Sequence, residues 1–368
     1  MSYKRLEEIT KYEQPTKYIV YSNEYKDNYD TPVLTAGKSF ILGYTNDTDG
    51  IYMASPENPV IIFDDFTTDL RYVDFPFKVK SSAIKFITSD KYNLKYLYHA
   101  MKNMNFNADT HKRYWISEFS KLTVPDIPIN EQKFIAEKLD LIDNQILLLE
   151  NSNHEIDKMY NASFMEYFGN PDDNKKGFEV GTINDVCSSI VRGPFGSSLK
   201  KEFFVEKSID TYKVYEQKNA IQKNEKLGNY YITKEKFDEM KRFEVKSDDI
   251  IMSCSGTMGE LYQLPKKAEA GIINQALCKF TLNNKLTPNY FMNYFSLTLY
   301  RLDTRGSSIK NIASVKYVKE LPIIIPPIEV QKDYEKIVGR LNEIKDINNK
   351  KIEKYKMVYD NIINKYFN

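Results

Sequence analysis

The sequence of 368 residues has few of the residues that form disulfides and metal sites. Its three cysteines, Cys187, Cys254 and Cys278, are far apart and include no Cys-x-x-Cys pair. An odd and scattered set of cysteines argues against a disulfide framework and against a zinc site. The three histidines form no His-Glu-x-x-His motif, which argues against a zinc hydrolase. We expect no metal ligands in this chain.

Signatures of common catalytic sites are also absent. The sequence has no Gly-x-Ser-x-Gly elbow, no phosphate-binding P-loop and no Gly-x-Gly-x-x-Gly motif. It also lacks the Asn/Asp-Pro-Pro-aromatic signature of enzymes that methylate amino groups on bases, because its one Pro-Pro pair is followed by isoleucine. These absences predict that the chain contributes no catalytic residues.

Signals for a membrane or for secretion are missing as well. No apolar run approaches the roughly 18 residues that cross a bilayer, and the start, MSYKRLEEIT, has no apolar core typical of a signal peptide. We therefore expect a cytoplasmic protein without a membrane partner. The net charge of +1 gives no indication of nucleic acid by itself.

The most informative feature that is present is a segment that occurs twice. Residues 124–143 read VPDIPINEQKFIAEKLDLID, and residues 323–342 read IIIPPIEVQKDYEKIVGRLN. In both, a hydrophobic run leads to Pro-Ile, then to Gln-Lys, then to a helical pattern. Gln132 corresponds to Gln331 without a gap. Self-similarity of this kind indicates two copies of one structural unit.

Each copy leads into a long helical pattern whose apolar residues step by four and three positions, the spacing of a coiled-coil seam. The pattern of the first helix, residues 131–168, is interrupted by Asn153 and Ser163, and that of the second by Lys345 and Asn348. The seam positions are Ile135, Leu139, Ile142, Ile146, Leu149, Asn153, Ile156, Tyr160, Ser163 and Tyr167, followed in the second helix by Tyr334, Val338, Leu341, Lys345, Asn348, Ile352, Tyr355, Tyr359, Ile362 and Tyr366.

The two helices are predicted to pair antiparallel. The first carries three lysines against eight acidic residues, and residues 330–368 carry nine basic against six acidic residues. Opposite charges favour pairing. In one register every seam position meets another, so that Tyr160 faces Leu341 and Asn153 faces Asn348. The alternatives are a register shifted by one heptad and two helices that each pack on their own domain.

The segments before the two helices share a plan of strand-like runs, such as NPVIIFDDF and DDIIMSCSG, separated by turn signals. The predicted fold class is therefore α+β, with two globular mixed α/β domains separated by a long antiparallel two-helix coiled coil and related by a pseudo-twofold internal repeat. The predicted segments are a first domain at 1–130, a central helix at 131–170, a second domain at 171–327 and a C-terminal helix at 328–368.

Polar and cationic loops with aromatic residues are candidates for contacts with DNA, because they can hold phosphates and reach base edges. Residues 177–327 carry 22 basic against 17 acidic residues, whereas residues 1–130 carry 16 against 17. Two heads joined by long helices suit two half-sites at a fixed distance. The candidate DNA-binding residues are Lys38, Ser39, Tyr44, Lys112, Arg113, Tyr114, Arg192, Ser197, Ser198, Lys200, Lys201, Arg305, Ser307 and Lys310.

One motif suggests a different chemistry. Pro125-Asp126 followed by Glu131-x-Lys133 imitates a metal-binding pattern of nucleases, in which two carboxylates and a lysine hold a metal and orient water. The second copy of the segment has isoleucine and valine at the positions of the two acids. Glu131 also fits the first turn of a helix, where the dipole favours acids. A metal-dependent nuclease and a coiled-coil adaptor that binds only proteins are the alternative interpretations.

The paired segments LTVPDIPINEQKFIAEKL and LPIIIPPIEVQKDYEKIV resemble the specificity subunit of type I restriction–modification systems, as does VCSSIVRGPFGSSLKK, which resembles the opening of a recognition domain. The resemblance covers essentially the whole chain, and its motif occurs twice at the expected separation. One departure is Ile127-Pro128, where the second copy has Pro326-Pro327.

The resemblance implies a non-catalytic subunit whose two target recognition domains each read one half of a split sequence in double-stranded DNA. It also implies that the helices dock two modification subunits, which bind S-adenosylmethionine and methylate adenine. Restriction subunits that use ATP and Mg²⁺ can join such a complex. The cofactors implied by the resemblance therefore belong to the partners and not to this chain.

Overall fold

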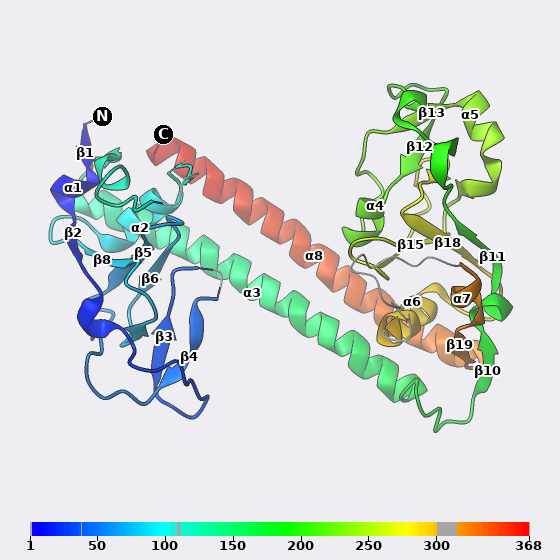
Figure 1. Ribbon diagram of the computed structural model, residues 1–368, viewed down its shortest axis with the longest axis horizontal. Coiled ribbons are helices and arrows are strands. Elements are labelled where there is room, and N and C mark those ends of the chain that lie inside the picture. Colours follow the sequence, from blue (N-terminus) through cyan, green and yellow to red (C-terminus); the bar gives the residue numbers. More distant parts are fainter. Residues whose placement is uncertain (1, 38, 105, 109–111, 300–314, 368) are drawn as a thin grey trace. The chain divides into compact units, whose positions relative to one another are not determined.

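The computed structural model describes residues 2–37, 39–104, 106–108, 112–299 and 315–367. The chain divides into two compact units, of which the first is Met1–Asn151 with Asn348–Asn368 and the second is Ser152–Ile347. Both units combine strands and helices, as the predicted mixed α/β composition requires. The two long helices, α3 (Ile129–Phe168) and α8 (Ile328–Tyr366), each contribute to both units (Figure 1).

The first unit holds a four-stranded antiparallel sheet in the order β2-β8-β5-β6 and a three-stranded sheet in the order β4-β3-β7, in which β3 and β7 run parallel. A separate pair, β1 and β9, leads toward α3. The elements are β1 (Tyr3–Arg5), α1 (Leu6–Ile9), β2 (Lys11–Glu13), η1 (Thr16–Tyr18), β3 (Thr31–Leu34), β4 (Ile41–Thr45), β5 (Val60–Asp64), β6 (Leu70–Val73), β7 (Lys78–Val79), β8 (Ile84–Thr88), α2 (Leu94–Lys102), η2 (Phe119–Lys121) and β9 (Thr123–Pro125).

The second unit holds a sheet in the order β11-β18-β15-β16 and another in the order β13-β12-β17-β14, in which β12 and β17 run parallel. The pair β10 and β19 leads toward α8. The elements are β10 (Glu179–Thr182), η3 (Ile183–Val186), β11 (Cys187–Arg192), η4 (Gly196–Ser198), η5 (Lys201–Phe203), β12 (Thr211–Tyr215), α4 (Gln217–Ile221), β13 (Tyr231–Thr233), α5 (Lys234–Glu239), η6 (Lys241–Phe243), β14 (Glu244–Val245), β15 (Ile250–Ser253), β16 (Leu261–Gln263), β17 (Gly271–Ile273), β18 (Leu277–Leu282), α6 (Pro288–Leu297), α7 (Val315–Glu320) and β19 (Pro322–Ile325).

The strand order of the two units corresponds element by element. The four-stranded sheet β2-β8-β5-β6 has the same connectivity as β11-β18-β15-β16, and the parallel pair β3 and β7 matches β12 and β17. Strand β14, which pairs antiparallel with β17, has a counterpart in the first unit that is only an isolated antiparallel bridge, between Tyr52 and Phe77 next to β7. The similar plan expected of the two halves is therefore visible in their strand order.

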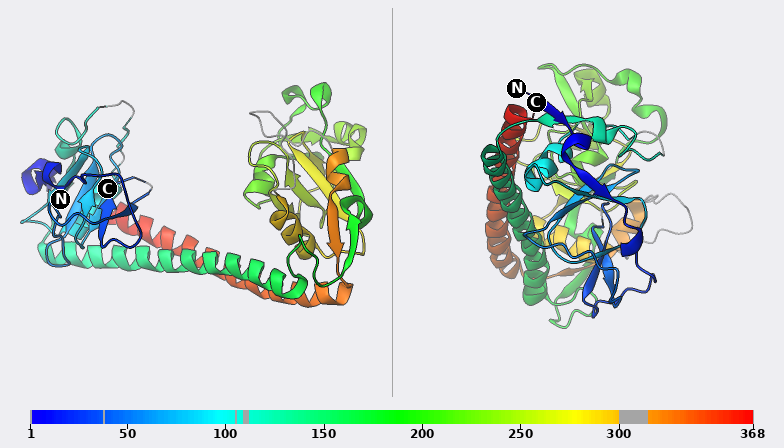
Figure 2. Two further views of the ribbon diagram at one scale, coloured as in Figure 1. Left: turned by 60° about the horizontal axis from the view of Figure 1, so that its bottom comes forward. Right: turned by 90° about the vertical axis from the view of Figure 1, so that its left-hand side faces the viewer.

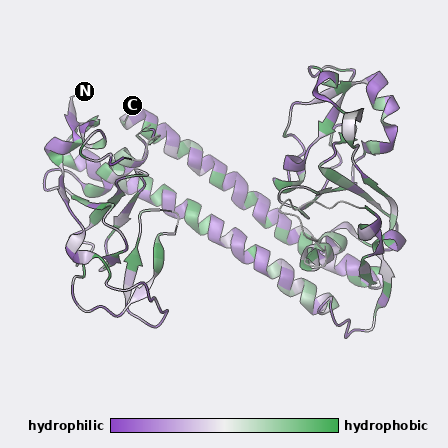
Figure 3. Ribbon diagram, viewed as in Figure 1, coloured by the Kyte–Doolittle hydropathy of each residue, from purple (hydrophilic) through white to green (hydrophobic). Residues whose placement is uncertain are grey.

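The central strand of each unit is buried on both faces. In β5, Ile61 and Phe63 pack with α2 and α3, while Ile62 packs with the second sheet. In β15, Ile250 packs with α6 and α8, and Ile251 packs with the second sheet. Since neighbouring side chains of a strand point to opposite faces, such a strand is apolar at consecutive positions, here Val60–Phe63 and Ile250–Met252. Figure 3 shows these central strands among the hydrophobic segments of both units.

A buried glutamine at the start of each long helix joins the helix to the rest of its unit. Gln132 donates from Nε2 to the Ile127 carbonyl oxygen at 2.8 Å, and its Oε1 accepts from the backbone N–H of Asn93 at 2.9 Å. Asn93 caps α2. One side chain thus connects three segments of the first unit.

Gln331 makes the corresponding contacts in the second unit. It donates to the carbonyl oxygens of Pro326 and Lys285 at 2.8 and 3.0 Å, and it accepts from the backbone N–H of Thr287 at 2.8 Å. Thr287 is the N-cap residue of α6. The duplicated Gln-Lys sequence therefore marks the point at which each helix is tied to the chain before it.

The two long helices contact each other within each unit. In the second unit the ring centroids of Tyr167 and Tyr334 are 6.0 Å apart, and the Tyr160 hydroxyl donates to Asn342 Oδ1 at 2.6 Å. Asn342 directly follows Leu341, the residue predicted to face Tyr160. In the first unit Lys356 and Glu150 form an ion pair at 3.9 Å. All predicted seam residues are buried or partly buried.

The opposition of Asn153 and Asn348 stays a prediction, because these residues belong to different units.

Among the described residues, every helix is too short or too polar to cross a bilayer.

Replacing Gln132 by alanine should destabilise the first unit, because the Asn93 N–H and the Ile127 carbonyl lose their partner in a buried place. A stranded buried group costs about 1–3 kcal/mol, so we expect a lower midpoint of urea unfolding. The matched control is Gln145→Ala in the same helix, since that side chain makes no hydrogen bond with a described residue. Equal midpoints for the two variants would contradict the role of Gln132.

Candidate nucleic-acid interface

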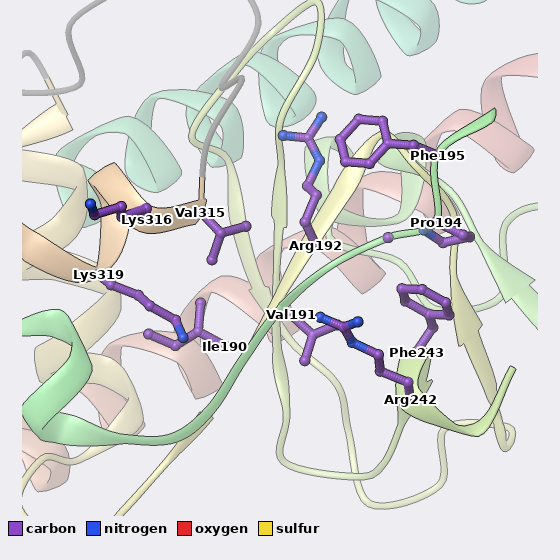
Figure 4. Close-up of a pocket in the computed structure, with 11 residues that line it drawn as sticks. Ile190, Val191, Arg192, Pro194, Phe195, Arg242, Phe243, Val315, Lys316 and Lys319 are labelled. Carbon is purple, nitrogen blue, oxygen red and sulfur yellow. The ribbon is translucent and has the colours of Figure 1, made fainter.

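A cavity of about 450 Å³ lies in the second unit where β11 ends, beside η6 and α7 (Figure 4). Its walls are built from three segments that are distant in the sequence. The lining residues are Ile190, Val191, Arg192, Gly193, Pro194, Phe195, Arg242, Phe243, Val315, Lys316 and Lys319. Four of them are cations and none is acidic, so the cavity favours an anion.

The arginines of this cavity lie against aromatic rings. The guanidinium of Arg192 is 5.3 Å from the ring centre of Phe195, and that of Arg242 is 5.9 Å from the ring centre of Phe243. Arg192 also donates from Nε to the Gln275 carbonyl oxygen at 2.9 Å. A guanidinium held over a ring keeps its charge while part of its surface is covered. The arginines are thus oriented without losing their charge.

Gly193 allows the strand end to take this path. A Cβ atom on Gly193 would lie 1.8 Å from the Asn274 carbonyl oxygen, so no other residue fits without a backbone shift. The Gly193 N–H donates to the Leu277 carbonyl oxygen at 2.9 Å. This close approach brings Arg192 beside Gln275, the residue that accepts its hydrogen bond. The Arg-Gly-Pro-Phe sequence therefore shapes one wall of the cavity.

The other predicted residues of the second unit lie just after this wall. Ser198 donates from its hydroxyl to the Phe195 carbonyl oxygen at 3.4 Å, and Lys200 forms an exposed ion pair with Glu202 at 3.5 Å. Lys201 is exposed at the start of η5. Predictions that fall outside the described residues or side chains concern Lys38, Ser197, Arg305, Ser307 and Lys310.

In the first unit the predicted residues differ in their surroundings. Lys112 forms an ion pair with Glu118, and the Arg113 guanidinium lies 6.0 Å from the ring centre of Phe66. Tyr114 is only 1% exposed and packs edge-on against Phe106 at 5.2 Å. Its buried ring leaves no surface for DNA, so the prediction that Tyr114 contacts DNA is wrong.

Ser39 and Tyr44 lie close to the β3–β4 hairpin of the first unit. Ser39 is exposed, and its carbonyl oxygen accepts from the Thr35 hydroxyl at 2.9 Å. Tyr44 is partly buried on β4 and pairs with Pro32. Both remain predictions.

Arg242, Phe243, Lys316 and Lys319 were not predicted from the sequence. Each belongs to a short segment that reads as an ordinary solvated turn or helix, and only the fold brings them to β11. The single available signal was the excess of basic residues in the second half.

The nuclease-like motif of the first unit is engaged in structural contacts. Asp126 Oδ1 accepts from the Tyr92 hydroxyl at 2.5 Å, and burial together with this hydrogen bond raises the pKa of Tyr92. Glu131 is exposed in the first turn of α3. Across the described part of the chain, no group of three or more His, Cys, Asp and Glu side chains is arranged to hold a metal ion.

Comparison with known proteins identifies the family. A model described as the type I restriction modification DNA specificity domain matches residues 1–158 and 175–356, which is most of the chain. The chain belongs to this family. The match covers two stretches, one on each side of the turn that follows α3, and thus agrees with the resemblance seen in the sequence.

A curated relative is the specificity subunit of the Escherichia coli type I restriction enzyme EcoR124I/EcoR124II. It is 53% identical over 143 residues, which cover 37% of this chain and 35% of that protein. The aligned part thus spans about a third of the relative.

Solved structures of type I restriction–modification proteins share the fold. The S subunit from M. genitalium matches with a TM-score of 0.65 at 15% identity, over 100% of this chain and 96% of that one. A structure from work on assembly and conformational transition of the type I system matches with a TM-score of 0.52 at 14% identity, over 100% and 97%.

Asp126→Asn and Glu131→Gln should leave DNA methylation and cleavage by the assembled complex unchanged, because both residues have structural surroundings. Asparagine keeps the oxygen that Tyr92 needs. Rates of both reactions are measured beside assembly and DNA binding of the same samples. Lost cleavage with normal assembly and binding would revive the nuclease interpretation.

Proposed function

We propose that this chain is the DNA-recognition subunit of a type I restriction–modification complex and that each unit reads one half of a bipartite duplex target. The observation that carries the proposal is the family match over two stretches, 1–158 and 175–356. The corresponding strand order of the two units supports it, because each half of the chain then supplies one reading head. The chain itself performs no chemistry.

The proposal includes an antiparallel coiled coil of α3 and α8 and a pseudo-twofold internal repeat. The helix contacts within each unit support this, as do the glutamines that begin both helices. A straight helix of 40 residues is about 60 Å long, more than one DNA turn of about 34 Å. A target with two half-sites and a spacer suits heads joined by such a helix.

In the first unit the head packs on one side of α3 and leaves apolar residues exposed on the other. His99 and Lys102 of α2 bond to Asp140 and Asp143 of α3 at 2.8 and 2.9 Å. At about 100° per residue, residues on the far side of the helix include Leu141 and Leu148, each 61% exposed. With Val358 of α8 they form the first apolar patch, defined as Leu141, Leu148 and Val358.

The second unit has a corresponding patch. There α6 covers α8, where the Asn289 N–H donates to Glu335 at 3.0 Å. The second apolar patch is Met159 of α3 with Ile344 and Ile347 of α8, all exposed. In the repeat, Leu148 corresponds to Ile347 and Met159 to Val358. In each unit the strands lie on one side of the paired helices (Figure 2), so the opposite side is open.

Exposed apolar patches of this kind mark protein interfaces. Since two residues of each patch correspond in the repeat, Leu148 to Ile347 and Met159 to Val358, we propose that each patch docks one modification subunit. In the proposed complex those subunits bind S-adenosylmethionine, and restriction subunits that join them use ATP and Mg²⁺. The place of action is the cytoplasm, where the DNA lies.

Exchanging residues 1–130 for the corresponding domain of another family member should change one half of the methylated motif and leave the other half intact, because each head reads its own half-site. Methylome sequencing of a host that expresses the chimera with its modification subunit measures the motif. A change in both halves, or in neither, would argue against separate reading heads.

Leu148→Glu and Ile347→Glu should each remove one modification subunit from the complex, and the double variant should lose both, because a charge in an apolar interface is left without a partner. Native mass spectrometry gives the subunit count. Leu147→Glu is the matched control, since Leu147 is exposed but lies outside the patches. A full complement of two subunits in the double variant would refute docking at these patches.

A further inference from the structure

We propose that the cavity at the end of β11 binds one backbone phosphate of the DNA, in the half-site that the second unit reads. The inference rests on the proposed function and adds the chemical group and the residues that hold it. Four described residues that line the cavity are cations that can donate to an anion, Arg192, Arg242, Lys316 and Lys319, and none of the described lining residues carries a carboxylate.

Two of these cations carry the argument. Arg242 and Lys319 form no ion pair with a described residue. Other lysines of this unit are paired with carboxylates, among them Lys200, Lys207, Lys218 and Lys241. Figure 4 shows their side chains approaching Ile190 and Val191 from two sides, Arg242 from η6 and Lys319 from α7. Apolar walls exclude water and strengthen the attraction between a cation and a phosphate.

The side chains of the lining favour a phosphate over a base. Lys and Arg can pair only with the acceptors of a base edge, as on guanine, whose edge is neutral, whereas a backbone phosphate offers acceptors that carry a negative charge. Among the described residues that line the cavity, every polar side chain is Lys or Arg, which donate only. The contact therefore fixes the position of the duplex and carries no sequence preference.

This cavity is a property of the second unit and not of the repeat. In the first unit Ile87 of β8 pairs with Tyr12, and in the second Phe280 of β18 pairs with Ile190. Both Ile87 and Phe280 belong to the core beside the long helices. One residue further along each strand, Glu13 of β2 therefore occupies the position that Val191 occupies in β11.

The next residue of each strand also differs in charge between the two units. Gln14 takes the position of Arg192, and its Oε1 accepts from Lys85 at 3.0 Å. Glu13 forms an ion pair with Lys17 at 2.7 Å. The first unit thus places a carboxylate and a neutral amide where the second places a valine and an arginine. One half-site is therefore held by a phosphate contact that the other half-site lacks.

The test uses the complex of the full chain with its modification subunits and a duplex that carries its methylated motif. Arg242→Ala with Lys319→Ala should weaken binding about tenfold or more, as expected for lost hydrogen bonds to a charged group. The salt slope should fall by about one unit for one phosphate. The methylated motif should stay unchanged.

Two control variants separate charge from position. Lys266→Ala with Lys267→Ala removes the same charge from two exposed lysines of the same unit that do not line the cavity, and should leave binding near that of the unsubstituted complex. Arg242→Lys with Lys319→Arg keeps both charges and should retain the salt slope. Equal urea midpoints for all variants establish that the fold is intact.

A methylphosphonate scan then locates the contact. Neutralising single phosphates should weaken binding of the unsubstituted complex at one position, or two adjacent positions, of the second half-site. At that position the Arg242→Ala, Lys319→Ala complex should show no further loss. Inorganic phosphate is then added as a competitor of the same duplex. We expect it to displace the duplex only at concentrations that also lower non-specific DNA binding.

Three outcomes overturn the inference while the proposed function stands. The first is a relaxed methylated motif in the Arg242→Ala, Lys319→Ala complex. The second is DNA binding by that complex as tight as that of the Lys266→Ala, Lys267→Ala control. The third is a loss of affinity from the variant that adds to the loss from the neutralised phosphate. Failure of the unsubstituted complex to bind its duplex would instead contradict the proposed function itself.

Discussion

The fold depends on one buried amide at the start of each long helix. Gln132 and Gln331 both donate to the carbonyl that precedes the helix and accept from the residue that caps the neighbouring helix. Only a side chain with a donor and an acceptor at this distance can satisfy both backbone groups, because leucine has neither and glutamate lacks the donor. The burial of these groups makes the contact obligatory. This is the physical reason why the same segment occurs twice.

Once the amide is in place, the layers of each unit follow. The helix it begins covers one face of the central strand, and the second sheet covers the other, so β5 and β15 are apolar on both faces up to their last residues, Asp64 and Ser253. The loops that are free to vary then lie at strand ends, where side chains can change without altering the strand order. At one such end, Gln14 and Arg192 occupy corresponding positions, so two units with similar strand order carry side chains of different charge there.

The sequence was sufficient for features that depend on local periodicity. The two long helices follow from the spacing of the apolar residues, and α3 begins two residues before the predicted start because Ile129 and Asn130 continue the turn that follows Pro128. The cavity could not be predicted in this way, because β11, η6 and α7 meet only through long-range strand pairing. Tyr114 was misjudged for a related reason, since a tyrosine after Lys-Arg looks exposed until Phe106 packs on it.

Charge counts from the sequence indicated a basic second half, but they could not separate buried charges from exposed ones. Lys85 is fully buried and paired with Asp65 at 3.0 Å, and Lys279 is buried beside Asp249 at 3.7 Å, so these charges contribute to the cores and not to a surface potential. A buried pair adds nothing to the attraction of DNA, whereas one exposed cation without a carboxylate adds its whole charge. The location of Arg242 and Lys319 beside an apolar wall is therefore a stronger indication of a phosphate contact than the net charge of the whole second half.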